Sequence, residues 1–434
     1  MLDELRSAAA RQREQRALRA VVLATKKLLS QNGEMNGMPL ARELIDRLET
    51  LGEAQLDAFF EHLSTALSPD PAAVLALAQA YAAAPGAAAL IALVNGVEPP
   101  RQELLRRLNR TPGGTAAILR LRRALLTRLP AHPEWQALEA DLLHLLSSWF
   151  NPGFLQMKRV DWNSPARLLE KIIQHEAVHA IDGWDDLRRR LQPDRRCFAF
   201  FHPQLPEEPL IFVEVALLPE MPAHIAPLID KASTPLAPER RRVAAFYSIS
   251  NCEPGLRGVS LGNFLIKQVA EQLQRELPRL KTFCTLSPMP GFAAWLLGTP
   301  DLAALPGTGK AAARLAAARQ RLLDATDGDL SRLQAARTLD ALDESAQQAL
   351  LSLAAAYLAL ASPTPAGDPV ARFHLDNGAR LERLDPRGNM SPKGLRQSFG
   401  LMVNYLYDLD RIETSHARFR AGDVVRSRAV AGLL

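Results

Sequence analysis

Cysteine is scarce in this sequence, and long apolar runs are absent. Only Cys197, Cys252 and Cys284 occur among 434 residues. Three scattered cysteines cannot build the disulfide framework of a small secreted protein, so we expect a reducing, cytoplasmic location. No apolar run approaches the ~18 residues of a transmembrane helix, and the Arg-rich N-terminus lacks the apolar core of a secretory signal. We therefore expect no membrane partner.

Strong charge of one sign is also missing. The formal net charge is +5, with 23% charged and 47% hydrophobic residues. This mild positive excess suits anionic ligands, but the arginine clusters lie on different predicted elements rather than along one stripe. We expect no nucleic-acid partner. The apolar content and the length are sufficient for two or three domains with substantial cores.

Residues 1–150 show the helical spacing of leucine and alanine throughout, interrupted by Pro and Gly breakers such as Pro99–Pro100. No cluster of catalytic residue types occurs in this stretch. We interpret it as an all-helical bundle that serves packing or self-association, so we expect a homo-oligomer, either a dimer or a tetramer. Asn151–Pro152–Gly153 marks the predicted domain boundary.

Residues 151–434 have a different pattern, which predicts an α+β domain with a mixed sheet and a helical insertion at about 299–366. Asn377–Gly378 stands between two short apolar runs, a pairing typical of a β-hairpin. The predicted strands cover residues 197–202, 210–217, 243–250, 281–286, 370–375, 379–384 and 402–407.

The stretch from Val243 to Phe292 organises this domain. A buried strand is followed by a glycine-bearing turn and then by a helix with apolar residues at every fourth position from Leu261 to Leu277. A second strand follows, which completes a βαβ unit. Because such a turn points backbone N–H groups beyond the helix N-terminus, we expect an anionic ligand there, most simply a phosphorylated one.

The turn itself is similar to that of the GNAT acyltransferases, whose backbone amides hold the diphosphate of coenzyme A. The segment reads Arg257, Gly258, Val259, Ser260, Leu261, Gly262 and Asn263. A tight strand-to-helix connection that needs glycine would give the same pattern. The strand before it and the amphipathic helix after it favour the ligand-binding interpretation.

Two further residues could carry chemistry. Ser287 follows the second strand of the βαβ unit and precedes Pro288, so its hydroxyl is expected at a strand end near the same crevice. His374 is expected near the end of a strand, just before Asn377–Gly378. A turn serine and a half-buried structural histidine are the plain alternatives for these two residues.

A zinc-protease pattern occurs at His175–Glu176–Ala177–Val178–His179. On a helix, this pattern would place two imidazoles on one face with a glutamate between them. No third ligand follows at a usual spacing, so we expect no metal site, although metal binding by His175 and His179 stays open. The loop 306–310 departs from the phosphate-loop pattern and is interpreted as a polar loop.

Taken together, these stretches resemble the malonyl-CoA decarboxylase family. The similar segments lie between residues 145 and 434, and the likeness includes the plan of a helical N-terminal domain followed by a GNAT-like mixed-sheet domain. LSPMPGF and FHLDNGA are the most specific motifs. The segments that carry the resemblance are FYSIS (246–250), GVSLGNFLIKQV (258–269), LSPMPGF (286–292), FHLDNGA (373–379) and GLMVNYLY (400–407).

The resemblance implies specific roles. The family's catalytic serine and histidine fall on Ser287 and His374. Its acyl-CoA loop falls on Arg257 to Asn263, and a tyrosine that lines the site falls on Tyr407. We add Asn404 as a second residue that holds the acyl group. The family often carries glutamate where this chain has Ser260, so this chain lacks that carboxylate. Its animal members end in a peroxisomal tripeptide, and the ending Ala431 to Leu434 favours a bacterial-type cytoplasmic enzyme.

The implied reaction converts malonyl-CoA to acetyl-CoA and CO2 through a thioester enolate, with assistance from serine and histidine and without a metal. No cofactor is expected, since coenzyme A is part of the substrate. Whether Ser287 orients the substrate or forms an acyl intermediate is open at this point. The alternative functions are a GNAT-type acyltransferase, a zinc hydrolase and a non-catalytic acyl-CoA sensor.

Overall fold

The computed structural model describes residues 2–30, 37–259, 261, 265–306, 309, 311–364 and 367–434. The chain forms two compact units. The first comprises Met1–Gln156, Phe201–Pro209 and Glu253–Leu261, and the second comprises Met157–Phe200, Leu210–Cys252 and Gly262–Leu434. In the part of the chain described, no helix is long and apolar enough to cross a membrane.

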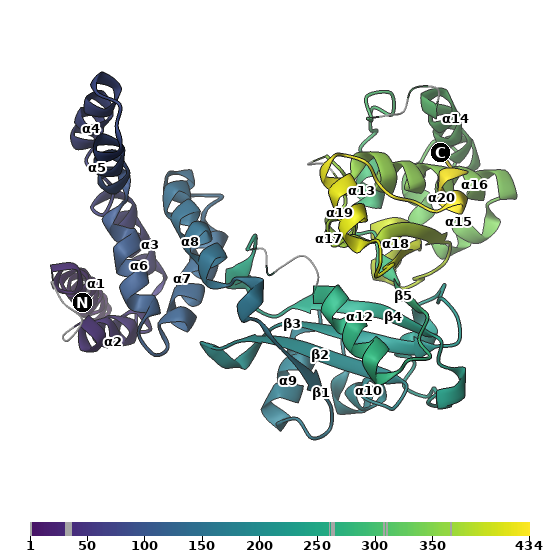
Figure 1. The fold of residues 1–434 in the computed structure, drawn as a ribbon, viewed down its shortest axis with the longest axis horizontal. Helices are drawn as coiled ribbons and strands as arrows, with labels where there is room; N and C mark the ends of the chain where they lie inside the picture. Colours follow the sequence, from purple (N-terminus) through teal and green to yellow (C-terminus); the bar gives the residue numbers. More distant parts are fainter. Residues whose placement is uncertain are drawn as a thin grey trace. The chain divides into compact units, whose positions relative to one another are not determined.

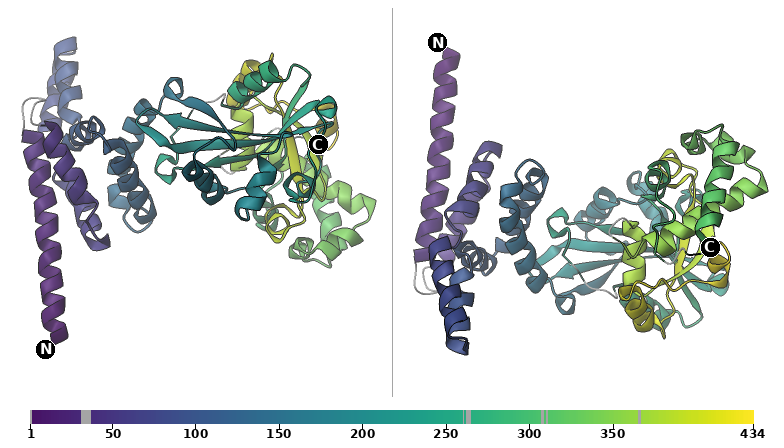
Figure 2. Two further views of the ribbon diagram at one scale, coloured as in Figure 1. Left: turned by 90° about the horizontal axis from the view of Figure 1, so that it is seen from below. Right: turned by 90° about the horizontal axis from the view of Figure 1, so that it is seen from above.

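The first unit is built mainly from helices (Figure 1). Proline at the first helical position opens both α4 and α6, where its missing N–H is not needed. Its longest helix, α1, extends over 29 residues and is the purple rod in Figure 2. The helices are α1 (Leu2–Ser30), α2 (Gly37–Leu48), α3 (Glu53–Thr65), α4 (Pro71–Ala83), α5 (Ala87–Val97), α6 (Pro100–Asn109), α7 (Gly114–Arg128) and α8 (Gln136–Trp149).

The sheet is mixed, as the sequence predicts. Its order is β1-β2-β3-β4-β5-β8-β6, and β7 pairs with β8 off this path. β4 and β5 run parallel, whereas β3 with β4, and β8 with β5, β6 and β7, pair antiparallel. The strands are β1 (Gln156–Val160), β2 (Arg195–His202), β3 (Leu205–Leu218), β4 (Val243–Asn251), β5 (Thr282–Thr285), β6 (Ser287–Pro288), β7 (Arg380–Asp385) and β8 (Met402–Leu406).

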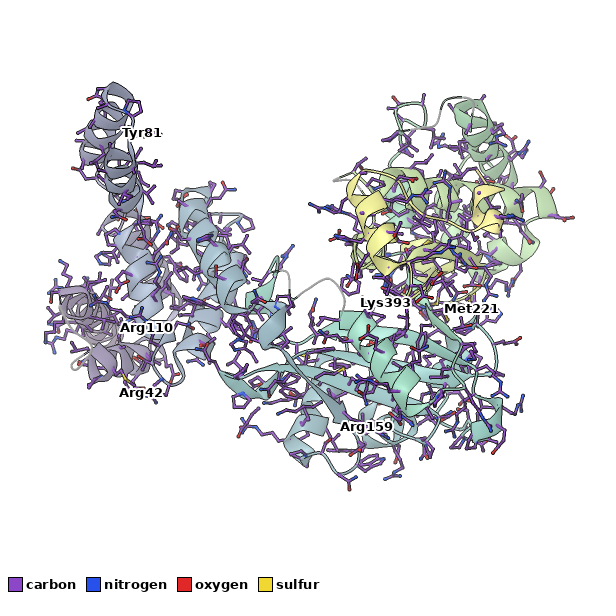
Figure 3. The ribbon with its side chains drawn as sticks, in the orientation of Figure 1. Arg42, Tyr81, Arg110, Arg159, Met221 and Lys393 are labelled. Carbon is purple, nitrogen blue, oxygen red and sulfur yellow. The ribbon has the colours of Figure 1, made fainter. Side chains whose placement is uncertain are left out.

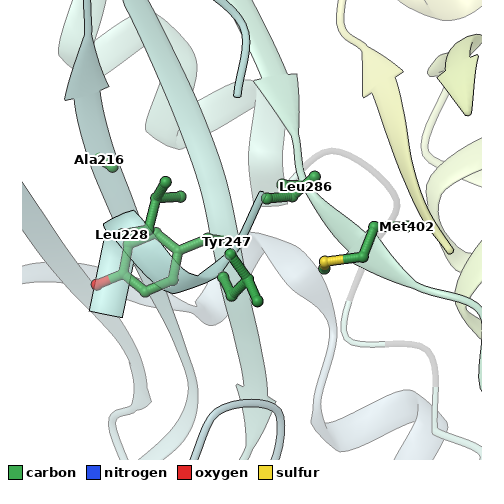
Figure 4. Packing of buried hydrophobic residues seen from close by; sticks show 6 residues of the cluster. Ala216, Leu228, Tyr247, Leu286 and Met402 are labelled. Carbon is green, nitrogen blue, oxygen red and sulfur yellow. The ribbon is translucent and has the colours of Figure 1, made fainter. Parts of the chain in front are cut away.

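The parallel pair β4–β5 is joined by α12, which completes the expected βαβ unit. Every fourth residue of α12 from Leu265 to Leu273 is buried, which gives the helix one continuous apolar face. A core cluster elsewhere in the second unit gathers side chains from several strands, among them Tyr247 and Met402 (Figure 4). Burial of these apolar side chains is the main favourable term in holding the sheet together.

Further helices lie between and after these strands in the sequence of the second unit. The region predicted as a helical insertion contains α14, α15 and α16, and α16 continues into a π-helical turn at Tyr357–Ala361. The helices are α9 (Ala166–His175), α10 (Gly183–Arg190), α11 (Ala226–Ile229), α12 (Leu265–Glu276), α13 (Phe292–Leu297), α14 (Ala311–Ala325), α15 (Ala336–Ala341), α16 (Glu344–Ala356), α17 (Pro369–Asp376), α18 (Pro392–Ser398), α19 (Ile412–Arg420) and α20 (Arg428–Ala431).

One predicted strand is wrong. Residues 370–375 belong to helix α17 instead, and Asn377–Gly378 ends that helix rather than forming a hairpin turn. The Asp368 side chain accepts hydrogen bonds from the first turn of the helix, Pro369 occupies its first position, and Gly378 has φ +79° beyond its end. His374 is therefore presented by a helix, and only the run after the glycine forms a strand, β7.

Candidate active site

Ser287 and His374 lie in hydrogen-bond contact although 87 residues separate them. Ser287 starts the short strand β6, opposite Val403 of β8, and His374 projects from α17. The Ser287 Oγ lies 2.9 Å from the His374 Nε2. Their exposed fractions are 5% and 3%, so the pair is largely removed from water. This contact is the geometry required of a hydroxyl and an imidazole that exchange a proton.

A second hydroxyl contacts the other nitrogen of the same imidazole. The Tyr407 hydroxyl lies 2.9 Å from the His374 Nδ1. The ring of Tyr405 stacks on His374 with centroids 4.7 Å apart and an interplanar angle of 28°. Tyr405 lies in β8, and Tyr407 directly follows the last residue of that strand. A spacing of two residues in extended chain points side chains to the same face. Together these tyrosines fix the imidazole plane between its two hydroxyl partners.

Thr285 is a member of the cluster that the sequence reasoning missed. The Ser287 hydroxyl donates to the Thr285 Oγ1 over 2.9 Å, and that oxygen also accepts the Tyr405 backbone N–H over 3.2 Å. Thr285 is fully buried. Thr285 lies two residues before Ser287, and in extended chain such residues point their side chains to the same face. This spacing is the signal that could have identified Thr285.

Burial controls the charge of the site. It lowers the pKa of His374 from 6.5 to about 3, and it raises the pKa of Tyr407 well above its usual value. The imidazole is therefore neutral at physiological pH, with one nitrogen as donor and the other as acceptor. Since each flanking hydroxyl can donate or accept, the row Ser287–His374–Tyr407 can pass a proton along without creating a buried charge.

Asn404 does not share this environment. It alternates with Tyr405 along β8, which places its side chain on the opposite face of the strand. Its Nδ2 donates to the backbone carbonyls of Thr285 at 2.8 Å and Pro222 at 3.0 Å. Both amide hydrogens are thus committed to main-chain oxygens, and the contact fixes β8 against the segment that leads to Ser287.

The acyl-CoA loop predicted at Arg257–Asn263 is described only in part. Arg257 follows a 3-10 turn at Pro254–Leu256, and Gly258 has φ +81°, a backbone conformation that favours glycine. Val259 and Leu261 are buried. Ser260, Gly262 and Asn263 lie outside the described residues.

The zinc-protease pattern is not on one helical face. α9 ends at His175, and the rest of the pattern continues beyond that end. Glu176 accepts hydrogen bonds from the hydroxyls of Ser248 and Ser250 and from the N–H of His179. Among the residues that the structure describes, no group of three or more His, Cys, Asp or Glu side chains could hold a metal ion. Glu176 thus ties the chain after α9 to β4.

Comparison with known proteins settles the family. The model of the malonyl-CoA decarboxylase C-terminal domain matches residues 153–434, and that of the malonyl-CoA decarboxylase N-terminal domain matches residues 67–150. The chain belongs to the malonyl-CoA decarboxylase family. The helical region followed by a mixed-sheet domain is therefore the arrangement expected for this family.

Solved structures of the family cover almost all of the chain. Malonyl-CoA decarboxylase from Rhodopseudomonas palustris is 46% identical with a TM-score of 0.85, covering 96% of this chain and 99% of that one. The protein from Agrobacterium vitis is 45% identical with a TM-score of 0.82, covering 95% and 99%. These similarities extend through both the helical and the mixed-sheet regions.

Curated relatives are longer than the matched region. The mitochondrial malonyl-CoA decarboxylase of Mus musculus is 37% identical over 331 residues, which are 72% of this chain and 66% of the relative. The corresponding protein of Anser anser anser is 36% identical over 340 residues, 74% and 66% of the two chains. The match thus spans just under two thirds of these relatives.

Proposed function

We propose that this protein is an enzyme that converts malonyl-CoA to acetyl-CoA and CO2, a carboxy-lyase. The observation that carries the proposal is the buried contact between Ser287 and His374 in a chain of this family. The neutral state of the imidazole and its second hydroxyl partner, Tyr407, supply the rest of a proton-transfer row.

In the proposed mechanism, the bond between Cα and the carboxylate carbon breaks and its electron pair moves into the thioester as an enolate, while CO2 leaves. The Ser287 hydroxyl binds the malonyl group and orients the leaving carboxylate. The dry surroundings favour movement of charge away from that carboxylate. His374 then gives a proton to Cα. The Tyr407 hydroxyl donates a proton to the imidazole, and water finally restores the proton of Tyr407, so that one proton is consumed per turnover.

Substrate binding would adjust the proton donor. The bound malonyl carboxylate brings a negative charge toward His374, and a nearby opposite charge favours the protonated imidazole. The pKa of His374 would then rise from its value of about 3, which burial sets. The imidazole would then carry a second, transferable proton only when substrate is present, and the buried site would hold no extra proton at other times.

The coenzyme A portion is proposed to bind at the loop Arg257–Asn263, whose amides would face the diphosphate. No metal and no separate cofactor takes part in this scheme, because the thioester itself accepts the electrons. Asn404 supports the site through the carbonyl of Thr285. The contact with the acyl group that the sequence suggested for Asn404 stays a prediction.

Turnover of malonyl-CoA in the presence of EDTA tests the proposal. We expect acetyl-CoA and CO2 in equal amounts, and we expect Ser287→Ala and His374→Asn each to lower kcat by about 100-fold or more. Absence of product from the wild-type protein contradicts the decarboxylase function. Consumption of acetyl-CoA only with an added amine would indicate an acyltransferase, and tight binding without turnover would indicate a sensor.

Mass spectrometry of the protein during turnover distinguishes the two roles of Ser287. If the hydroxyl only orients the substrate, the mass of the protein stays constant. A covalent acyl adduct on Ser287, absent from Ser287→Ala, would instead show nucleophilic catalysis.

We also propose that the protein is a homo-oligomer in the cytoplasm. All three cysteines are buried and none is joined in a disulfide, which suits a reducing compartment. The α4–α5 hairpin supports self-association, since neither helix has a buried residue although both are strongly apolar. Acetyl-CoA release would link the enzyme to fatty-acid metabolism.

A further inference from the structure

A single arginine of the helical domain fastens the segment that leads into the proposed acyl-CoA loop. Arg122 of α7 donates from Nη1 to the carbonyl of Gly255 and from Nη2 to the carbonyl of Arg257, each over 2.7 Å. All these residues belong to the first compact unit. The segment Glu253–Val259 is thus held against a domain that carries none of the proposed catalytic residues.

The guanidinium of Arg122 is itself rigidly held. Its exposed fraction is 1%, and Glu139 of α8 accepts from its Nε at 3.0 Å and from its Nη2 at 2.6 Å. A buried charge of this kind is tolerated only when it is paired and its N–H groups are satisfied. The planar fork of arginine meets both demands at once, which the single ammonium of lysine cannot do.

The segment lies close against α7 at Gly255. A Cβ at Gly255 would lie 2.5 Å from the backbone oxygen of Leu119, so only glycine fits. The peptide between Arg257 and Gly258 is fixed through its carbonyl. Because the C=O and N–H of a trans peptide point in opposite directions, the bond to Arg122 turns the Gly258 N–H away from the guanidinium. Arg122 therefore sets the direction of an amide in the proposed diphosphate-binding loop.

We propose that Arg122, oriented by Glu139, is a positioning residue for binding of the diphosphate part of the substrate. The inference rests on the proposed function, since it takes coenzyme A thioesters as the ligands. It gives the helical domain a part in substrate affinity beyond self-association. Arg122 does not touch the ligand in this scheme, and its effect passes through the backbone of Arg257 and Gly258.

Steady-state kinetics on two substrates test the proposal. Arg122→Lys keeps the charge but cannot bridge both carbonyls and Glu139. We expect it to raise KM for malonyl-CoA about tenfold with kcat within about twofold, as for loss of one charge-assisted contact. For malonyl-pantetheine, which lacks the diphosphate, kcat/KM should match that of the wild-type protein.

Arg101→Lys is the matched control. Arg101 has an exposed fraction of 4% in the same domain and is paired with Asp141 at 2.6 Å, but its other hydrogen bonds reach Leu63 and Ser68 rather than the loop segment. Its KM for malonyl-CoA should stay at the wild-type value. Equal losses on both substrates in Arg122→Lys, or the same rise of KM in Arg101→Lys, would overturn the proposal.

Calorimetric binding of free coenzyme A separates this inference from the decarboxylase function, since it needs no turnover. Glu139→Gln keeps the shape of the acceptor and removes its charge, so it serves as a second variant if Arg122→Lys does not fold. We expect both variants to bind coenzyme A more weakly by about tenfold. Binding at wild-type affinity in the folded variant would contradict the inference even if malonyl-CoA is turned over.

Discussion

His374 is a buried base that stays neutral, and this has a consequence for stability. Its folded-state pKa of about 3 lies below the ordinary value of 6.5 because the imidazole is desolvated. As pH falls below 6.5, the unfolded chain takes up a proton that the folded protein does not. The free energy of unfolding therefore decreases from pH 6.5 toward pH 3.

Replacing His374 by Gln should make this acid sensitivity shallower. Each neutral buried histidine lowers the free energy of unfolding by at most about 1.4 kcal/mol for each pH unit below its unfolded-state pKa. Thermal unfolding at about pH 7 and about pH 5.5 should show a smaller fall of Tm in His374→Gln than in the wild-type protein. His144→Gln, at an exposed position of α8, should leave the fall unchanged. Equal slopes in wild type and His374→Gln would show that the imidazole is not held neutral.

Asp368 connects the two elements that carry the proposed catalytic pair, Ser287 and His374. Its Oδ1 accepts the N–H groups of Val370 and Ala371 at the start of α17, and its Oδ2 accepts the Gly291 N–H over 3.0 Å. Gly291 lies four residues after Ser287. One fully buried carboxylate thus caps the helix of His374 and anchors the loop that follows β6.

Asp368→Ala should affect both stability and catalysis. Loss of the cap and of the Gly291 contact should lower the free energy of unfolding by about 2 kcal/mol, measured by chemical denaturation. It should also lower kcat at least tenfold, because α17 and the loop are no longer fixed to each other.

Asp343→Ala is the control for this prediction. Asp343 caps α16 through the Ala346 N–H at 2.8 Å, in an exposed position. Its loss should reduce stability by about 1 kcal/mol and leave kcat unchanged. If Asp368→Ala keeps the kcat of the wild-type protein, the carboxylate has a purely structural role.

At the scale of the whole molecule, the α4–α5 hairpin is the most apolar exposed element. Leu75 and Ile91 are each 59% exposed and Val94 is 56% exposed. No charged residue occurs from Pro71 to Val97. Figure 3 shows the hairpin with its side chains, including Tyr81. A membrane-binding surface would carry Lys or Arg, so an uncharged patch fits a second copy of itself better.

Ile91→Asp should therefore reduce the oligomeric state. A carboxylate at a position repeated in both partners would be desolvated next to its own copy, which disfavours the interface. Light scattering coupled to gel filtration should give a smaller mass for Ile91→Asp than for the wild-type protein. Ile91→Leu keeps the apolar area and should keep the mass. A wild-type protein that is already monomeric would contradict the prediction.

Much of the fold follows from local sequence patterns. Apolar residues at every fourth position from Leu265 to Leu273 predict α12, and the apolar run beginning at Val243 predicts β4. The strand predicted at residues 370–375 was wrong because a short apolar run before Asn-Gly fits either a strand or a capped helix. The pair Asp368–Pro369 is the helix-start signal that decides between them.

The sequence by itself determined the family and most elements, because periodicity, caps and motifs such as LSPMPGF are properties of neighbouring residues. It also placed Ser287 and His374 among the candidates. Only the tertiary structure decided that these two side chains meet, that Thr285 joins them, that Asn404 faces away, and that Arg122 holds a segment 133 residues distant. Such contacts depend on how the packing of elements brings together backbone positions that are remote in the sequence. No local sequence pattern encodes the distance between two remote side chains.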